Sequence, residues 1–383
     1  MKRRAFLLLP PALLFGRAAR ARAPDYPPVR SGEQLAFPRD FGAHSRYRTE
    51  WWYATGWLQT DTGASLGFQV TFFRSRPALD DANPSRFAPA QLLFANVALS
   101  DPDVGRLQHD QRAARSGFGL ADASEADTNV HIGEWSLRRE TDGRYLVSVA
   151  AADFMFLFTM QPTHPALVNG ASGYSRKGPM PDEASYYYSE PWLHVDGTLT
   201  RRRLPGGIPD HDPEHVNGTA WLDHEWSSAA LAEGAVGWDW IGINLDDGGA
   251  VMAFQIRDKA GHKFWAGGTL RNADGNTRAL APESVSFTPL RWWRSPHTGA
   301  RYPVAMRVDA GDAHLVLAPL MDDQELDSRA STGAVYWEGA VVALNVSGVN
   351  TASAASGPGA TDAATRLGRG YLELTGYFQR LDL

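Results

Sequence analysis

The chain has 383 residues, 43% of them hydrophobic, a net charge of −6 and no cysteine. This length suggests about two domains, and the absence of cysteine excludes disulfides and thiolate metal sites. The 37 glycines, 24 prolines and 13 tryptophans favour a turn-rich, aromatic β protein, and no internal run reaches the roughly 18 apolar residues of a membrane-spanning helix.

The first 23 residues have the pattern of an export signal. A basic start containing Arg3-Arg4 precedes an apolar stretch to Phe15 and the small-residue cleavage pattern Ala21-Arg22-Ala23. The arginine pair, followed by Phe6-Leu7, resembles a twin-arginine signal, which carries folded proteins. We therefore expect a periplasmic or secreted protein.

Cleavage after residue 23 would leave 31 basic and 43 acidic residues, a net charge of −12. Such a surface disfavours nucleic acid and anionic membranes as partners. We also expect no transmembrane segment in the mature chain.

Residues 24–47 are rich in proline and arginine and predict an extended lead-in, and strand signals begin at Glu50. Alternation along that strand divides its side chains between two faces. One face carries Glu50, Trp52 and Leu58, and the other carries Trp51, Tyr53 and Trp57. One face must pack against a core, and the other must face a lumen or a partner domain.

More strands are predicted along the first half of the chain. Alternating or apolar runs predict strands over residues 65–74, 92–99, 130–138, 145–151 and 154–161. Asp142-Gly143 is a hairpin signal, residues 75–91 and 164–184 read as loops, and residues 109–127 are compatible with short helical turns.

The second half repeats the first weakly. An aromatic strand around Trp238–Leu245, an Asp-Gly turn and a strand with a central Phe254-Gln255 parallel the hairpin that begins at Trp52. We predict an all-β protein of two domains, residues 48–205 and 206–383, because two β units of this size suit barrels or sandwiches. Residues 347–367 are small-residue sequence and predict a flexible loop between the last two strands.

The run from Trp221 to Trp226 carries the main candidate chemistry. Trp221, Asp223 and Glu225 share one face, and Leu222, His224 and Trp226 share the other. An acid buried in a pocket lined by Trp238 and Trp240 would have a raised pKa and could protonate an alkene, with aromatic faces stabilising the cation and His224 relaying the water proton. Alternatively, the acids pair with arginines and His224 is a hydrogen-bonded core residue.

Other polar residues are interpreted as structural. Glu50 is expected to pair with an arginine such as Arg74, and Glu338 and Glu373 are expected to be paired acids on late strands. The His211–His215 segment holds two histidines and two acids, but Pro209 and Pro213 break the helix that a zincin site needs, so no metal is expected. No Gly-x-Ser-x-Gly elbow is present, so the sequence does not support serine hydrolysis. P-loop and Rossmann motifs are also missing, and no cofactor is expected.

Five motifs, in order, resemble the secreted AttH-like family, which is related to carotenoid 1,2-hydratases (hydroxyneurosporene synthases). They are Glu50–Leu58, Trp221–Ser228, Gly237–Trp240, Tyr336–Gly339 and Gly370–Tyr377. The resemblance covers nearly the whole mature chain. It implies two tandem lipocalin-like antiparallel β-barrels packed together, and fungal proteins of similar architecture act as cyclases on apolar polyenes.

The resemblance also bears on the site. In the hydratase branch a His-x-Trp pair matters, and here it stands as His224-Glu225-Trp226; that branch has a tyrosine and an aspartate in the following strand, where this chain has Phe254 and Gln255. His224, Asp223 and Glu225 are therefore the candidate catalytic residues. The candidate ligand-binding residues are Glu50, Trp52, Tyr53, Trp57, Trp226, Trp238, Asp239, Trp240 and Tyr371.

Two functions remain open. The first is a binder that holds a lipid, isoprenoid or polyketide in an aromatic barrel cavity and serves an envelope transport system. The second is a cofactor-independent lyase, a hydratase or cyclase that acts on an alkene by acid catalysis. An enzyme needs a proton donor with a perturbed pKa in the cavity, whereas a carrier needs only apolar walls.

Overall fold

The computed structural model describes residues 25–79, 85, 87–201, 212–346 and 366–381. Within these ranges it is all-β, as predicted, with two short 3-10 turns, η1 (Arg39–Phe41) and η2 (Pro282–Ser284). In the described part of the chain, no helix has the length and apolarity to cross a membrane.

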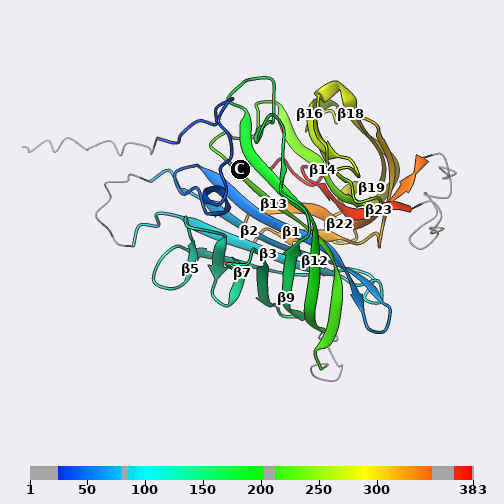
Figure 1. Cartoon of the computed structure of the whole chain (residues 1–383), viewed down its shortest axis with the longest axis horizontal. Coiled ribbons are helices and arrows are strands. Elements are labelled where there is room, and N and C mark those ends of the chain that lie inside the picture. Colours follow the sequence, from blue (N-terminus) through cyan, green and yellow to red (C-terminus); the bar gives the residue numbers. More distant parts are fainter. Residues whose placement is uncertain (1–24, 80–84, 86, 202–211, 347–365, 382–383) are drawn as a thin grey trace, which may run out of the picture.

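The strands form two antiparallel sheets (Figure 1). The first sheet contains β1 (Thr49–Thr60), β2 (Ser65–Ser75), β3 (Leu92–Ser100), β4 (Leu107–Arg115), β5 (Ala121–Ala123), β6 (Asn129–Ile132), β7 (Trp135–Arg139), β8 (Tyr145–Ala150), β9 (Phe154–Pro162), β10 (Leu167–Val168), β11 (Tyr174–Arg176), β12 (Ala184–Arg201) and β13 (Glu214–Ser227). The second contains β14 (Ala235–Leu245), β15 (Ala250–Asp258), β16 (Lys263–Arg271), β17 (Thr277–Leu280), β18 (Val285–Arg294), β19 (Arg301–Ala310), β20 (Ala313–Pro319), β21 (Glu325–Ser328), β22 (Ala334–Asn345) and β23 (Arg366–Leu374).

The two sheets share one strand order, which confirms the internal repeat. The series β4-β3-β2-β1-β13-β12-β9-β8-β7 in the first sheet corresponds to β17-β16-β15-β14-β23-β22-β20-β19-β18 in the second. In each sheet the first strand pairs with both the second strand and the last one, so β1 pairs with β2 and β13, and β14 pairs with β15 and β23. This order curls each sheet toward a lipocalin-like barrel, and the two ends of the order, β4 and β5 in the first sheet and β17 and β18 in the second, are consecutive strands of the chain.

The change from one sheet to the other lies later than the predicted 205/206 boundary. β13 pairs with β1 over its whole length, from Thr49 opposite Ser227 to Thr60 opposite Val216. Residues 214–227 therefore belong to the first sheet, where β13 lies between β1 and β12. The chain enters the second sheet only after Ser227.

The structure differs from several local predictions and confirms another. Residues 109–127 contain strands β4 and β5 rather than helical turns, and the predicted strand over residues 130–138 is the hairpin β6–β7, which turns at Gly133 with a φ of 58°. The hairpin predicted at Asp142-Gly143 is confirmed between β7 and β8. Most of the predicted loop at 347–367 lies outside the described residues.

Alternation explains why there are three large apolar clusters. Side chains on the inner face of each sheet form its core. The first core contains Trp52, Phe68 and Phe158, and the second contains Ile241, Tyr302 and Trp337. The outward faces of β1, β13 and β14 meet in a third cluster between the sheets, which contains Tyr53, Trp57, Trp221, Trp240 and Tyr371. Strands β1 and β13 therefore have two buried faces, one packed in the first core and the other packed against the second sheet.

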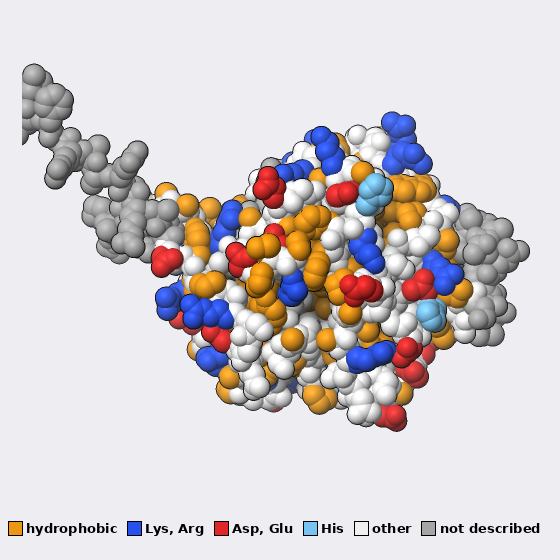
Figure 2. All heavy atoms as spheres, turned by 90° about the horizontal axis from the view of Figure 1, so that it is seen from above, with side chains coloured by type: hydrophobic (Ala, Val, Ile, Leu, Met, Phe, Trp, Pro, Cys, Tyr) orange, Lys and Arg blue, Asp and Glu red, His pale blue; other side chains and the backbone are white. Residues whose placement is uncertain are grey.

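Polar contacts fix the two units against each other. The Trp57 indole donates to the carbonyl of Gly370 (3.1 Å), and Asn96 donates to the hydroxyl of Tyr336 (3.0 Å). The Ser100 hydroxyl donates to Gln324 (2.8 Å). Seen from above (Figure 2), hydrophobic side chains gather in the middle of the visible face with acidic and basic side chains interspersed among them.

Candidate functional site

Strand β13 divides the candidate catalytic residues between two environments, as the alternation predicted. Asp223 and Glu225 project toward the second sheet and line a pocket, whereas Leu222 belongs to the core inside the first sheet. His224 points to that same inner side, where it contacts Trp52 and Tyr188. The strand therefore separates the histidine from the two acids that are its neighbours in sequence.

The pocket lies between the two units and has a volume of about 360 Å³. Its aromatic walls come from both sheets: Trp51, Tyr53 and Tyr187 from the first, and Trp238, Trp240 and Phe254 from the second. Polar side chains interrupt these aromatic walls, and the charged ones are Glu50, Arg74, Lys177, Asp223, Glu225 and Glu373. The cavity was expected inside a barrel; this pocket is at the seam between two.

Asp223 is 3% exposed and accepts three hydrogen bonds. Ser189 Oγ (2.6 Å) and Trp221 Nε1 (2.7 Å) donate to Oδ1, and Tyr187 Oη (2.7 Å) donates to Oδ2. Burial raises the pKa of Asp223 to about 7, although these hydrogen bonds lower it, and the charge of Glu225 adds to the rise. An aspartate that exchanges protons near neutral pH thus stands in an apolar wall.

Glu225 has a partner of its own. Lys177 Nζ lies 2.9 Å from the Glu225 carboxylate and also over the rings of Tyr187 (4.8 Å) and Phe254 (4.2 Å). The lysine therefore neutralises Glu225 and contacts aromatic walls from both sheets. Glu225 was expected to pair with an arginine or face the cavity; it faces the cavity while paired with a lysine.

Glu373 on β23 lines the same pocket from the second sheet. Its carboxylate accepts a hydrogen bond from Trp238 Nε1 (2.7 Å). Burial raises the pKa of Glu373 to about 7, the indole lowers it, and the charges of Asp223 and Glu225 raise it further. Its cross-strand neighbour Glu338 accepts a hydrogen bond from Tyr53, and burial raises the pKa of Glu338 well above its usual range.

His224 belongs to a buried ionic network beneath β1. Its Nε2 and the Nδ1 of His44 each lie 2.8 Å from the same oxygen of Glu50, and Arg74 Nε donates to the other oxygen at 2.8 Å. The expected Glu50–Arg74 pair is thereby confirmed. His224 Nδ1 also lies 3.0 Å from the Tyr188 hydroxyl, so its two ring nitrogens are both satisfied.

Three potential metal ligands, His44, Glu50 and His224, have ligand atoms within 4.8 Å of one another. Both histidines use the facing nitrogen to hydrogen-bond Glu50, and Arg74 brings a positive charge to the same carboxylate. The hydrogen bonds account for the cluster as an ion pair network. In the segment named for metal ligation, His211 lies outside the described residues and His215 contacts Asp61 and Asp196.

The pocket gathers only part of the predicted binding set. Among those residues, Glu50, Tyr53, Trp238 and Trp240 line it together with Asp223 and Glu225. The others lie elsewhere. Trp52 and His224 face the first core, Trp226 stacks on His44, Trp57 and Tyr371 pack in the seam away from the pocket walls, and Asp239 pairs with Arg257.

Sequence reasoning gave no pocket role to Lys177 or Glu373, and it treated Phe254 only as a departure from the hydratase pattern. Glu373 had a usable signal, since its strand mixes an acid with aromatics. Lys177 lies in a segment predicted to be a loop, where no periodic pattern reports the direction of a side chain.

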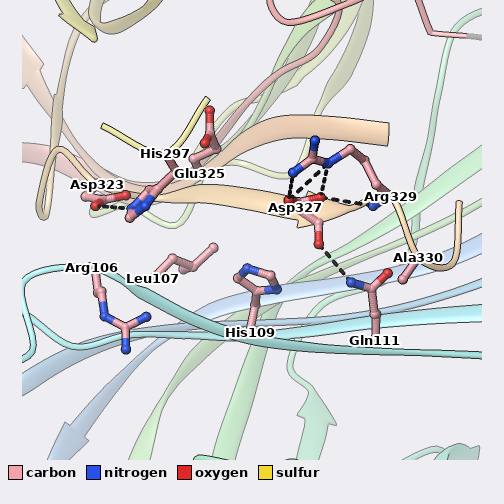
Figure 3. A pocket seen from close by; sticks show the side chains of 10 residues that line it. All are labelled: Arg106, Leu107, His109, Gln111, His297, Asp323, Glu325, Asp327, Arg329 and Ala330. Carbon is pink, nitrogen blue, oxygen red and sulfur yellow. Dashed lines mark hydrogen bonds and ion pairs between the residues drawn. The ribbon is translucent and has the colours of Figure 1, made fainter. Parts of the chain in front are cut away.

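A second, more polar cleft of about 520 Å³ opens between β4 and β21 (Figure 3). His297 pairs with Asp323 (2.9 Å), Asp327 pairs with Arg329, and Gln111 donates to the backbone carbonyl of Asp327 (2.8 Å). The charges in this cleft are largely paired with one another.

Comparison with known proteins identifies relatives of the whole chain. The AttH-like family model matches residues 28–377. The solved structure of an AttH protein from Nitrosomonas europaea is 52% identical, with a TM-score of 0.80, and the match covers 92% of this chain and 100% of that one. Kievitone hydratase from Nectria haematococca matches with 14% identity and a TM-score of 0.64, over 94% of this chain and 98% of that one. A search of curated proteins found no significant match.

Proposed function

This chain belongs to the AttH-like family, and from that premise we propose that it is a hydro-lyase. It binds an apolar, unsaturated molecule in the pocket between its sheets and adds water across a carbon–carbon double bond, or removes it. The observation that carries this proposal is Asp223, a buried acid with a pKa of about 7 in a largely aromatic wall. Perturbed acids in a cleft mark candidate functional sites, and three hydrogen-bond donors hold the Asp223 carboxyl at the pocket wall.

The walls suit the charge that such a reaction develops. Protonation of an alkene leaves a cationic carbon, and the faces of tryptophan and tyrosine rings attract positive charge. Trp238 and Trp240 come from one sheet and Tyr53 from the other, so a bound molecule has rings on two sides. The fold is shared with kievitone hydratase, but at 14% identity the likeness carries the fold alone, and the proposed activity rests on the pocket.

The site requires no cofactor in this proposal, because protons and water are its only reagents. We also propose that the protein works after export by a twin-arginine signal at its first 23 residues. An envelope transport system could then supply or receive the apolar molecule. Detection of the processed chain in the periplasm of cells with a working twin-arginine pathway, and not in cells without one, tests the export step.

Binding is tested with all-trans-retinol, a neutral polyene whose fluorescence is excited by energy transfer from nearby tryptophans. We expect saturable binding to wild type, and weaker binding by at least about tenfold in Trp240→Ala, since removing a buried ring costs several kcal/mol. Trp292→Ala is the matched control because Trp292 is 45% exposed and does not line the pocket.

Reaction is tested with a panel of neutral alkenes, including retinol, farnesol and squalene, in water labelled with oxygen-18. Mass spectrometry should detect uptake of one labelled water by at least one alkene, and the uptake should fall at least about 100-fold in Asp223→Asn. The exposed Asp196→Asn is the control. Tight binding without water uptake from any alkene would make the protein a carrier instead.

A further inference from the structure

The proposed hydration needs two groups, one that gives a proton to the alkene and one that takes a proton from the attacking water. On the basis of the proposed function, we infer that these groups come from different units: Glu373 on β23 is the proton donor and Asp223 on β13 is the proton acceptor. The active site would then exist only where the two sheets meet, and Glu373 would be a further catalytic residue.

The hydrogen bonds around Asp223 fix it as an acceptor. The indole nitrogen of Trp240 can only donate, and it lies 3.1 Å from the Tyr187 hydroxyl, so the hydroxyl hydrogen of Tyr187 is directed to Asp223. Asn169 Nδ2 likewise donates to Ser189 Oγ (2.8 Å), which leaves the serine hydrogen for Asp223. With the Trp221 indole, three oriented donors favour the carboxylate form.

Glu373 has a different environment. The Trp238 indole donates a hydrogen bond to Glu373 Oε2. Its neighbours include the acids Asp223 and Glu225, whose negative charge opposes ionisation of Glu373. When Asp223 and Glu373 share one proton, that proton therefore resides on Glu373, which has fewer donors stabilising its charged form.

Glu225 does not fill either role as well. Its carboxylate is paired with Lys177 at 2.9 Å, so this oxygen is already engaged by a positive partner. Glu338, the cross-strand neighbour of Glu373, is bonded to Tyr53 and does not line the pocket. Glu50 also lines the pocket, but its carboxylate is held by His44, His224 and Arg74. Asp223 and Glu373 are therefore the two acids that remain for the reaction.

The step balances without another reagent. The Glu373 carboxyl transfers its proton to one alkene carbon, and the π electrons form the new C–H bond, which leaves the other carbon cationic. A water oxygen bonds to that carbon while Asp223 accepts a proton from the water. The product is an alcohol, Asp223 is protonated and Glu373 ionised, and transfer of one proton from Asp223 back to Glu373 through pocket water restores the site. Dehydration runs the same steps in reverse.

The pairing can be tested on the full chain without any substrate. In protein made with carbon-13 glutamate, the infrared carbonyl band of protonated Glu373 is the band that disappears in Glu373→Gln. We expect it to titrate near neutral pH in wild type and at lower pH in Asp223→Asn, because the charge that opposes ionisation of Glu373 has been removed. Glu338→Gln is the matched control, since it removes a neighbouring buried carboxyl outside the pocket and should leave the Glu373 titration in place.

If Glu373→Gln fails to fold, Trp238→Phe replaces it. Loss of the indole donor should move the Glu373 titration to higher pH. A Glu373 carboxyl that is ionised across the neutral range, or that titrates identically with and without Asp223, overturns the pairing.

Activity separates this inference from the proposed function. With an alkene that takes up water, Glu373→Gln should lower kcat at least about 100-fold with little change in KM, as expected for loss of a general acid. Wild type should show a bell-shaped pH profile, and a variant lacking either acid should lose one limb. Normal turnover in Glu373→Gln overturns the role of Glu373 while leaving hydration established, whereas no hydration by wild type overturns the proposed reaction itself.

Discussion

At the scale of single residues, adjacent positions on β13 do different work. Asp223 and Glu225 serve the pocket, whereas His224 holds Glu50 within the first unit. Alternation was enough to predict this division from the sequence. It could not predict which face was the pocket, because both faces of the strand are buried, and the pocket face is set by the packing of the second sheet, whose walls include Trp238 and Trp240 on β14 and Glu373 on β23.

The first prediction concerns His224. Replacement by alanine should lower the free energy of unfolding by about 2–4 kcal/mol, because it opens a cavity and removes a hydrogen bond to the buried Glu50 carboxylate. Retinol binding should stay within about threefold of wild type at a temperature where the variant is folded. Urea unfolding and retinol titration measure the two effects. If the variant had normal stability but failed to bind retinol, His224 would have to be a ligand-binding residue instead.

The second prediction concerns acid stability. Burial alone would raise the pKa of Glu50, but Arg74, His224 and His44 outweigh it and hold the pKa well below the usual 4.5. The stability that this lowered pKa provides is present above pH 4.5 and is lost as pH falls toward the folded-state pKa, because the unfolded chain takes up the proton first. The free energy of unfolding of wild type should therefore fall on acidification below about pH 5.

The matched comparison is between Glu50→Gln and the exposed Glu283→Gln. The first should be less stable at pH 7 and lose less stability between pH 5 and pH 3.5, since its position no longer titrates. The second should follow wild type throughout. Parallel pH curves for wild type and Glu50→Gln would show that the Glu50 pKa is not lowered in the folded protein.

At the scale of strands, the sequence predicted hairpins better than sheet edges. The β1–β2 and β14–β15 hairpins follow from alternation and Asp-Gly turns, and the equal strand order of the sheets follows from their repetition. β4 was missed because its pattern is largely polar and half-buried, which has no clear period. The Pro-Gly segment near residue 205 suggested a boundary, but β13, which follows it in the chain, pairs with β1 in the first sheet.

The third prediction uses the close approach of β2 to the second unit. A Cβ built on Gly67 would lie 2.6 Å from both the Ala340 Cβ and the Tyr371 hydroxyl, so a larger side chain must push the sheets apart. Gly67→Leu should lower the free energy of unfolding by several kcal/mol, by overpacking, and weaken retinol binding. Ser65→Val adds bulk two residues away at the less buried end of β2 and should change both quantities little.

At the scale of the whole molecule, the pocket belongs to neither repeat. The resemblance suggested an aromatic barrel cavity, but the described cores hold large side chains such as Trp52, Phe68, Tyr302 and Trp337. Aromatic residues on the outward faces of the strands enclose the pocket between the two sheets. A single sequence could show the aromatic content of both halves. It could not show that the outer faces of β1 and β13 meet those of β14 and β23.

The last prediction follows because both sheets contribute residues to the pocket. A ligand that contacts walls from both sheets binds only when both are folded, so it should protect strands of both units equally. Retinol at 100 times its Kd should stabilise the native state by about 2.7 kcal/mol. In hydrogen exchange measured by mass spectrometry, peptides covering β3 and β19, which lie in different sheets, should be slowed to a similar extent. Protection confined to one of the two peptides would place the bound molecule inside a single unit. Asp223 and Glu373, which lie on different sheets, could then not act on the same bound molecule.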